Sequence, residues 1–353
     1  MNNLQHFITN KKNHVDYLPE DELNAIIRGE IRNRKEEEGI DQSVNLDGGE
    51  SGSVLIDRKK TLNLRCLKEK AIHAFFLLNG LLVIIVLLGI FALLVFTSLP
   101  AFKEINLLHF FFSANWNPTS FVKESYGILS MIVSTLMVTI GALVISVPLG
   151  IGTAAYLSDV AGKRVREIGK PLVEILAGIP SVVIGFLGIV LVGPMIAKVF
   201  HLPNGLNALN GSILLAFMAL PTITSLSEDA LKNVPRSYEE ASLALGATRW
   251  QTVVKVKIPA AKSGILASCM LGMGRAIGET MAILMATGCA PAMPKSFLDS
   301  VRTMTSTIAI ELGEVPFNTT HYYALFGVGL VLFIITFIVN MVSDMILNKN
   351  KRC

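Results

Sequence analysis

Charge is scarce in this sequence. Asp, Glu, Lys and Arg make up 16% of the 353 residues, whereas 52% are hydrophobic and the mean hydropathy is +0.55. Because soluble globular domains carry about a quarter charged residues, the composition excludes an ordinary soluble domain and indicates a polytopic membrane protein. The net charge of +4 is modest, and we expect no nucleic-acid partner.

The sequence motifs of common hydrolytic and metal-dependent enzymes are also missing. The chain has no G-x-x-x-x-G-K-[ST] phosphate-binding loop, no H-E-x-x-H and no G-x-S-x-G. Its six histidines are scattered, and its four cysteines show no metal-binding or redox spacing. We therefore predict that the chain is not an enzyme, does not hydrolyse ATP itself, and binds no metal or cofactor.

The first 70 residues are polar, so we predict a cytoplasmic extension before the first membrane segment. The apolar spacing over Pro19–Glu38 predicts one helix. The following stretch, Gly39–Ser53, is rich in Gly, Ser and Asp, which is typical of a linker. No function follows from this region of the sequence.

The rest of the chain predicts an all-α membrane protein. We place the first transmembrane helix and an outer loop in residues 71–127, a core of five transmembrane helices in 128–347, and a cytoplasmic tail in 348–353. Gly, Pro and small polar residues occur throughout the core segments, which favours close helix packing around a pathway. Six segments have the length and apolar character to cross a membrane: His73–Leu99, Ile128–Leu157, Leu172–Val199, Leu206–Leu226, Gly264–Ala290 and Tyr322–Leu347.

Basic residues are distributed unequally between the two sides of these segments. Nineteen Lys and Arg residues flank one side, including the 158–171 loop and the 227–263 loop, and five flank the other. Because cytoplasmic loops carry the excess of Lys and Arg, we predict that both termini and the 227–263 loop are cytoplasmic. The predicted location is the plasma membrane, the inner membrane in a cell with two membranes, with lipid around the bundle.

The polar stretch Ser237–Pro259, which we call the coupling loop, carries the strongest local signals. Ser237 with Glu240, and Thr248 with Gln251, each have the spacing of a capping box. Gly246 is suited to end the first helix because a left-handed residue costs glycine little. The second helix is predicted to end before Pro259. The stretch therefore predicts two short helices that meet at a glycine.

Two ionisable residues, Arg275 and Glu279, fall near the middle of the fifth predicted segment, with Thr280 next to them. Charged groups there cost several kcal/mol, with estimates from about 2.5 to above 10. On a continuous helix, side chains four residues apart share a face and can reach each other. One interpretation is a structural ion pair; the other is that the residues line a pathway, where Arg275 would offer a fork of donors to an oxyanion.

The coupling loop resembles the EAA loop of the membrane permeases of ATP-binding-cassette (ABC) importers. That pattern is E-A-A, three residues, Gly, nine residues and then I-x-L-P; here it reads Glu240-Ala241-Ser242, Gly246 and Val256-Lys257-Ile258-Pro259. Ser242, Val256 and Ile258 are mild departures. The resemblance implies a type I importer permease fold and a loop that docks on a separate ATPase subunit. The residues it assigns to this coupling are Glu239, Glu240, Ala241, Gly246, Ala247 and Pro259.

The segment GRAIGETMAILMATG resembles the permeases of phosphate-specific ABC importers of the PstC type. Further matches are Ile179–Val183, residues 220–235 and residues 308–315, and the resemblance covers about residues 115–347. It implies a heterodimer with a PstA-like sister permease, two cytoplasmic ATPase subunits that use ATP, and a periplasmic or extracellular phosphate-binding protein. The transport pathway would include Arg275, Glu279 and Thr280.

Other functions remain open at this point. The chain could be the permease for another oxyanion or small solute in the same importer class. A proton-coupled secondary transporter would use Glu279 as its titrating carboxylate, but it leaves the coupling loop unexplained. A membrane sensor or scaffold would account for the N-terminal extension but not for Arg275 in the middle of a membrane segment.

Overall fold

The computed structural model describes residues 50–120 and 124–350, with side-chain surroundings for 72–120 and 124–345. The helix expected over Pro19–Glu38 and most of the expected linker lie outside the described residues. The chain divides into two units, residues 1–81 and 82–353. Helix α3 (Glu50–Glu104) begins before the predicted end of the linker, so residues 50–53 are helical.

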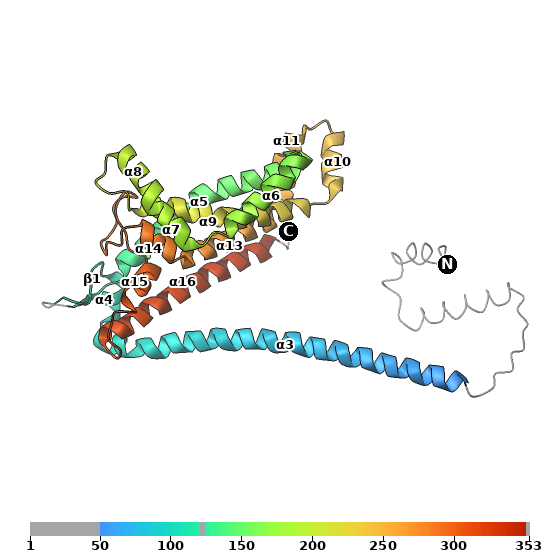
Figure 1. The fold of residues 1–353 in the computed structure, drawn as a ribbon, viewed down its shortest axis with the longest axis horizontal. Coiled ribbons are helices and arrows are strands. Elements are labelled where there is room, and N and C mark those ends of the chain that lie inside the picture. Colours follow the sequence, from blue (N-terminus) through green and yellow to red (C-terminus); the bar gives the residue numbers. More distant parts are fainter. Residues whose placement is uncertain (1–49, 121–123, 351–353) are drawn as a thin grey trace, which may run out of the picture. The chain divides into compact units, whose positions relative to one another are not determined.

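The second unit is a helical bundle (Figure 1). One small hairpin interrupts the helices: β1 (Trp116–Asn117) pairs antiparallel with β2 (Ser125–Tyr126), with Trp116 opposite Tyr126. Three segments of the described chain are π-helical, η2 (Tyr156–Val160), η3 (Gly188–Val192) and η4 (Val253–Lys257). The α-helices are α4 (Leu107–Phe112), α5 (Leu129–Ala155), α6 (Lys163–Ala177), α7 (Ser181–Leu187), α8 (Gly193–Phe200), α9 (Ala208–Lys232), α10 (Arg236–Ala244), α11 (Arg249–Thr252), α12 (Ile258–Ala260), α13 (Lys262–Gly278), α14 (Met281–Ala286), α15 (Met304–Glu311) and α16 (Thr320–Asn350).

Five helical stretches of the described chain are long and apolar enough to cross a membrane. They agree with five of the six predicted segments. The third of them begins only at Ser181 rather than at residue 172, because Pro180 disfavours the α conformation of the residue before it and α6 has already ended at Ala177. The five are Ile72–Glu104, Leu129–Val160, Ser181–Phe200, Ala208–Lys232 and Thr320–Met345.

The remaining predicted segment, Gly264–Ala290, is not one continuous helix, so that part of the prediction is wrong. Helix α13 ends at Gly278, Glu279 is extended with φ −70° and ψ 132°, and α14 starts at Met281. The hydroxyl of Thr305 donates to the Glu279 carbonyl at 3.0 Å. Because a partner outside the helix holds this carbonyl, the break can form without losing its hydrogen bond.

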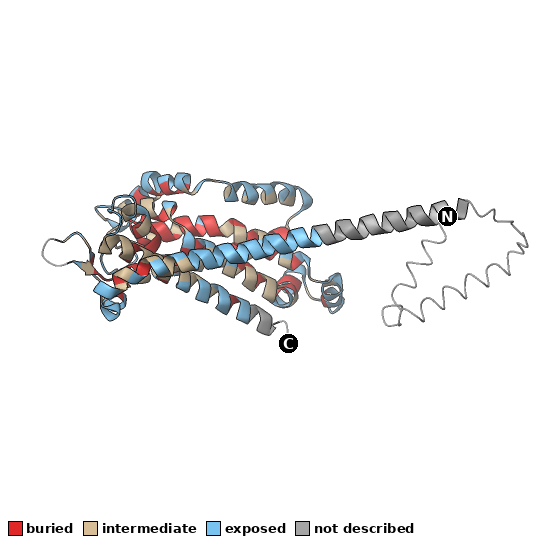
Figure 2. Ribbon diagram, turned by 90° about the horizontal axis from the view of Figure 1, so that it is seen from below, coloured by how far each residue is buried: buried red, intermediate tan, exposed pale blue. Residues whose placement is uncertain are grey.

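Helices α5, α9 and α13 form the centre of the bundle, where the buried residues concentrate (Figure 2). They approach closely at Ile223 of α9. A Cβ built on Gly150 of α5 or on Gly272 of α13 would lie 2.7 Å from a side-chain carbon of Ile223. Such contacts are typical of membrane bundles, in which small residues let helix backbones approach. By contrast, the described apolar side chains of α3 up to Ile90 are exposed, as expected of a helix that faces lipid.

The bundle has two distinct ends (Figure 1). Helices α10 and α11 lie at one end, which we call the coupling end. The hairpin, α4 and α15 lie at the other, which we call the hairpin end. Segments that are far apart in the sequence meet at each end, as the contacts of Lys257 with Asp159 and of Glu311 with Trp116 show. Each end contains one of the polar clusters described next.

Candidate functional site

The coupling loop forms the predicted helix–glycine–helix unit. After α10, Gly246 has φ +84°, its N–H donates to the Leu243 carbonyl at 2.9 Å, and the Ala247 N–H donates to the Ser242 carbonyl at 3.2 Å. This is the hydrogen-bond pair of a Schellman motif. Thr248 and Gln251 form both bonds of the predicted capping box. These two predictions are confirmed.

Two local predictions for the coupling loop are wrong. Ser237 does not cap α10, because the helix already starts at Arg236, directly after Pro235, whose ring fixes φ. The second helix does not end before Pro259. The wider π-helical turn η4 precedes this proline, with Ile258 donating five residues back to Val253. Such a turn moves the backbone that a proline ring would otherwise strike, so the chain stays helical through α12.

Hydroxyl and apolar side chains give the coupling loop a fixed shape and an exposed surface. Ser242, which departs from the EAA pattern, shares a 3.0 Å hydrogen bond with Thr252, and both are buried. This bond joins α10 to Thr252, the last residue of α11. Five large apolar side chains nevertheless stay exposed on this small unit, with Leu245 at 90% and Trp250 at 62%, accompanied by Tyr238, Leu243 and Val254.

Charged side chains are buried at the coupling end, which the sequence did not predict. Lys257 is 7% exposed and pairs with Asp159 of η2 and, at 3.6 Å, with Glu239 of α10. Glu228 of α9 is 1% exposed and pairs with Lys232 and Lys170. A cleft of about 450 Å³ opens beside the first cluster and is lined by Asp159, Arg236, Glu239, Glu240 and Lys257, among others.

Arg275 and Glu279 flank the break between α13 and α14 instead of sharing one helical face. The Arg275 side chain is exposed and its Nη1 donates to Thr222 Oγ1 at 3.4 Å. Glu279 Oε1 lies 3.5 Å from the Ala282 N–H at the start of α14. Within the described chain no ion pair joins the two residues. The expected contact is therefore absent, because the break at Glu279 removes the helical spacing on which it depended.

Thr280 belongs to the same break. Its hydroxyl lies 3.4 Å from the Gly278 carbonyl, and a Cβ on Gly278 would meet no atom within 4 Å. The three residues assigned to the transport pathway thus lie at one partly exposed interruption of the helix, with Arg275 as its cationic group. Their function stays a prediction.

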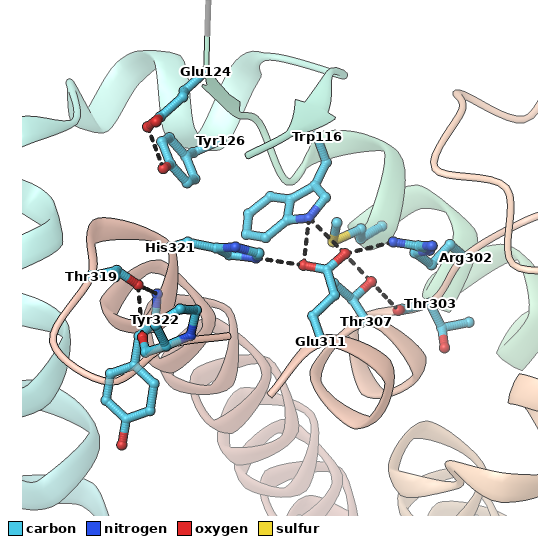
Figure 3. Close-up of polar contacts among 12 residues, drawn as sticks. Trp116, Glu124, Tyr126, Arg302, Thr303, Thr307, Glu311, Thr319, His321 and Tyr322 are labelled. Atoms are coloured by element: carbon cyan, nitrogen blue, oxygen red, sulfur yellow. Dashed lines mark hydrogen bonds and ion pairs between the residues drawn. The ribbon is translucent and has the colours of Figure 1, made fainter. Parts of the chain in front are cut away.

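The hairpin end contains a polar cluster around Glu311 (Figure 3). Its carboxylate accepts hydrogen bonds from Arg302 Nη1 at 2.7 Å, from His321 Nε2 at 2.8 Å and from Trp116 Nε1 at 3.0 and 3.1 Å. These partners come from the loop before α15, from α16 and from the hairpin. One carboxylate therefore holds together three segments that are far apart in the sequence.

Aromatic rings complete this cluster. Trp116 contacts both Tyr126 and His321, with ring centroids 5.9 and 6.0 Å apart. Burial raises the pKa of the Tyr126 phenol, and the hydrogen bond to Glu124 raises it further. Arg302 and Glu311 could be placed in an outer loop from the sequence, but nothing in their spacing indicates that they meet Trp116, which lies 195 residues before Glu311.

The fold indicates the class of protein. The structure is similar to the crystal structure of a bacterial ABC transporter involved in the import of the acidic polysaccharide alginate, with a TM-score of 0.55 over 79% of this chain and 98% of that chain. The sequences are only 15% identical, so this similarity concerns the fold alone. The chain therefore has the fold of a component of an ABC importer.

Sequence relatives give the family. A model of the family "Binding-protein-dependent transport system inner membrane component" matches residues 146–351, and the chain belongs to this family. The probable ABC transporter permease protein YqgH of Bacillus subtilis (strain 168) is 40% identical over 65% of this chain and 74% of its own length. The phosphate transport system permease protein PstC of Mesorhizobium japonicum is 32% identical over 84% of this chain and 95% of its own length. The phosphate transport system permease protein PstC 1 of Mycobacterium tuberculosis is 34% identical over 68% of this chain and 81% of its own length.

Proposed function

We propose that this chain is one of the two permease subunits of an ATP-driven phosphate importer. Its partners would be a PstA-like sister permease, two ATPase subunits and an external phosphate-binding protein. The similarity to proteins named as phosphate transport permeases, which extends over 84% of the chain in one case, supports the solute. The chain itself would bind no cofactor, and ATP would be used by the ATPase subunits.

The exposed apolar surface of the coupling loop is the observation that carries this proposal. Leu245 and Trp250 expose most of their side chains on a unit that internal hydrogen bonds hold rigid. Exposed apolar side chains gathered in this way mark protein interaction sites. A rigid surface of this kind, at one end of a membrane bundle, suits docking of an ATPase subunit. A proton-coupled secondary transporter would have no use for it.

The solute pathway would pass the break between α13 and α14. Arg275 is exposed there and is not neutralised by Glu279, so its guanidinium can donate two parallel hydrogen bonds to an oxyanion. Glu279 and Thr280 would form the adjoining wall of the path. The exposed surface around this break would then line a cavity between the two permease subunits.

Reconstitution tests this function. The four components in proteoliposomes should import phosphate only when ATP is present, and a protonophore should leave the uptake unchanged. Uptake that collapses with the protonophore and needs no ATP would support a secondary transporter instead. Competition by excess sulfate would show a broader oxyanion permease.

Substitutions at the break test the pathway. Arg275→Gln keeps much of the length and hydrogen bonding of the side chain but removes the charge and the fork, so phosphate uptake should fall at least tenfold while the complex still assembles. Lys262→Gln removes a charge from an exposed position at the start of the same helix and should transport normally. If the two variants transport equally well, Arg275 does not meet the anion.

We propose the orientation from the basic residues, with the coupling end in the cytoplasm. In a variant without native cysteines, Lys163→Cys, at an exposed position of the basic 158–171 loop, should react with a membrane-impermeant thiol reagent only after permeabilisation, whereas Lys295→Cys should react in intact cells. The opposite labelling pattern would reverse the topology.

A further inference from the structure

The ion pair between Lys257 and Asp159 connects two segments that lie 98 residues apart in the sequence. Lys257 is the last residue of η4 in the coupling loop, and Asp159 lies in η2, which continues α5. Both side chains are about nine-tenths buried. The pair therefore lies inside the coupling end, beneath the surface that a docked subunit could contact.

Burial of this pair carries a cost that ordinary packing would avoid. Ions taken out of water are stabilised only where partners surround them, and a buried ion pair is often no more stable than apolar residues of the same size. Asp159 Oδ2 has no hydrogen-bond partner in the described protein, so the site is not fully compensated. Stability alone is thus a weak explanation for this pair, which raises the question of a role in mechanism.

The position of the pair suits the transfer of movement. Glu239 of α10 lies 3.6 Å from Lys257 and is 43% exposed at the cleft, so it connects the buried pair to the helix that carries the EAA motif. On the other side, α5 has the most extensive packing with α9 of any two described elements. A displacement of α10 is thereby connected, through Glu239, Lys257 and Asp159, to the central helices.

We propose that Lys257 and Asp159 are a positioning pair that transmits movement of the coupling loop to α5. This inference rests on the proposed importer function, because it assumes an ATPase subunit that moves the loop. A neighbouring apolar contact joins the same segments, since Val253 packs in one cluster with Ala154 and Ala155. The apolar contact then holds the two segments together, and the ion pair makes α5 move when the coupling loop moves.

The test compares ATP hydrolysis with phosphate uptake in proteoliposomes of the complete complex. The doubly neutral variant, Lys257→Met with Asp159→Asn, leaves no charge stranded and should assemble. We expect it to hydrolyse ATP within about twofold of the wild type while the phosphate imported per ATP falls at least tenfold. Lys257→Arg, which keeps a cation for both Asp159 and Glu239, should retain a large part of the wild-type ratio.

Two further variants separate the pair from general effects. Lys262→Met removes an exposed charge just beyond the loop and should keep the wild-type ratio. Val253→Ala weakens the apolar contact and should lower the yield of assembled complex without changing the ratio. A wild-type ratio in the doubly neutral variant would overturn the proposal, as would loss of coupling in Val253→Ala alone. A wild-type complex that imports no phosphate would instead refute the proposed function.

Discussion

Replacing Glu311 with alanine should open the cluster at the hairpin end. Its side chain is 14% exposed and accepts hydrogen bonds from three donors, of which Arg302 is charged and 17% exposed. Removing one partner of a buried ion pair costs about 3–5 kcal/mol, because the other charge remains buried. Arg302 keeps its second bond, from Nε to the Cys289 carbonyl at 2.9 Å, so we expect the lower value, about 3 kcal/mol.

The assay is hydrogen–deuterium exchange of the amides of α15 in the purified complex. If these amides exchange through local opening, about 3 kcal/mol corresponds to roughly a hundredfold faster exchange. Glu311→Gln should cost less, about 1 kcal/mol, and speed exchange only about fivefold. Its carbonyl oxygen can still accept from Arg302 and Trp116, and His321 can turn an unprotonated ring nitrogen toward the amide.

The matched control is Glu314→Ala, which removes an exposed carboxylate three residues away. It should change exchange less than twofold. Equal exchange in the Glu311→Ala and Glu314→Ala proteins would refute the reasoning, because it would mean that the hydrogen bonds of Glu311 do not hold the three segments together.

Three other predictions follow from local geometry. Gly246→Ala should destabilise the coupling loop by about 1–2 kcal/mol, because the backbone φ of +84° disfavours a residue with a Cβ even where a methyl group has space. Gly313→Ala, at a position with space and no positive φ, should not destabilise the protein. Thermal unfolding of the complex compares the two variants. Gly205→Ala should abolish the folded yield, since its Cβ would lie 1.8 Å from the Gly193 carbonyl oxygen, whereas Gly152→Ala, with nothing within 4 Å, should fold. Hydrogen bonds from the N–H groups of Lys295 and Ser296 lower the pKa of the Asp299 carboxyl below its ordinary value of 3.8. These bonds therefore stabilise the 295–299 loop above pH 3.8, and the stabilisation is lost as the pH falls through the lower pKa of the folded protein. Hydrogen exchange of the amides of this loop should show that pH dependence, and Asp299→Asn should remove it.

The sequence was most informative where a local rule decides the structure. Gly246 and the Thr248–Gln251 pair act within a few residues, so their geometry could be predicted. Apolar length likewise located the membrane helices. Pro259 does not end the helix, because a proline is tolerated where a wider π-helical turn precedes it. Val253 of η4 packs in one cluster with Ala154 and Ala155 of α5 and with Leu231 of α9, and a local pattern does not contain such contacts.

Long-range contacts explain the other misses. The break at Glu279 is supported by Thr305, and the environment of Arg275 includes Thr222 from another helix. The four-residue spacing of Arg275 and Glu279 predicts a contact between them only on one continuous helix, and the helix breaks at Glu279. The partners of Glu311 and Lys257 lie up to 195 residues away. Charges in outer or cytoplasmic loops look alike in a sequence, whether they end up solvated or buried.

The π-helical turns at Asp159 and Lys257 have a consequence for insertions and deletions. Each such turn contains one residue more than an α-helical turn would. Deleting a single residue from η2 or η4 would restore regular α geometry, and the side chains beyond the turn would keep their facing, because the wider turn already accommodates the extra residue. Deleting a residue from the regular part of α5 or α13 would instead rotate every following side chain by about 100°. In an alignment with relatives, single-residue gaps should therefore be tolerated at these two turns and be rare within the regular helices that they adjoin.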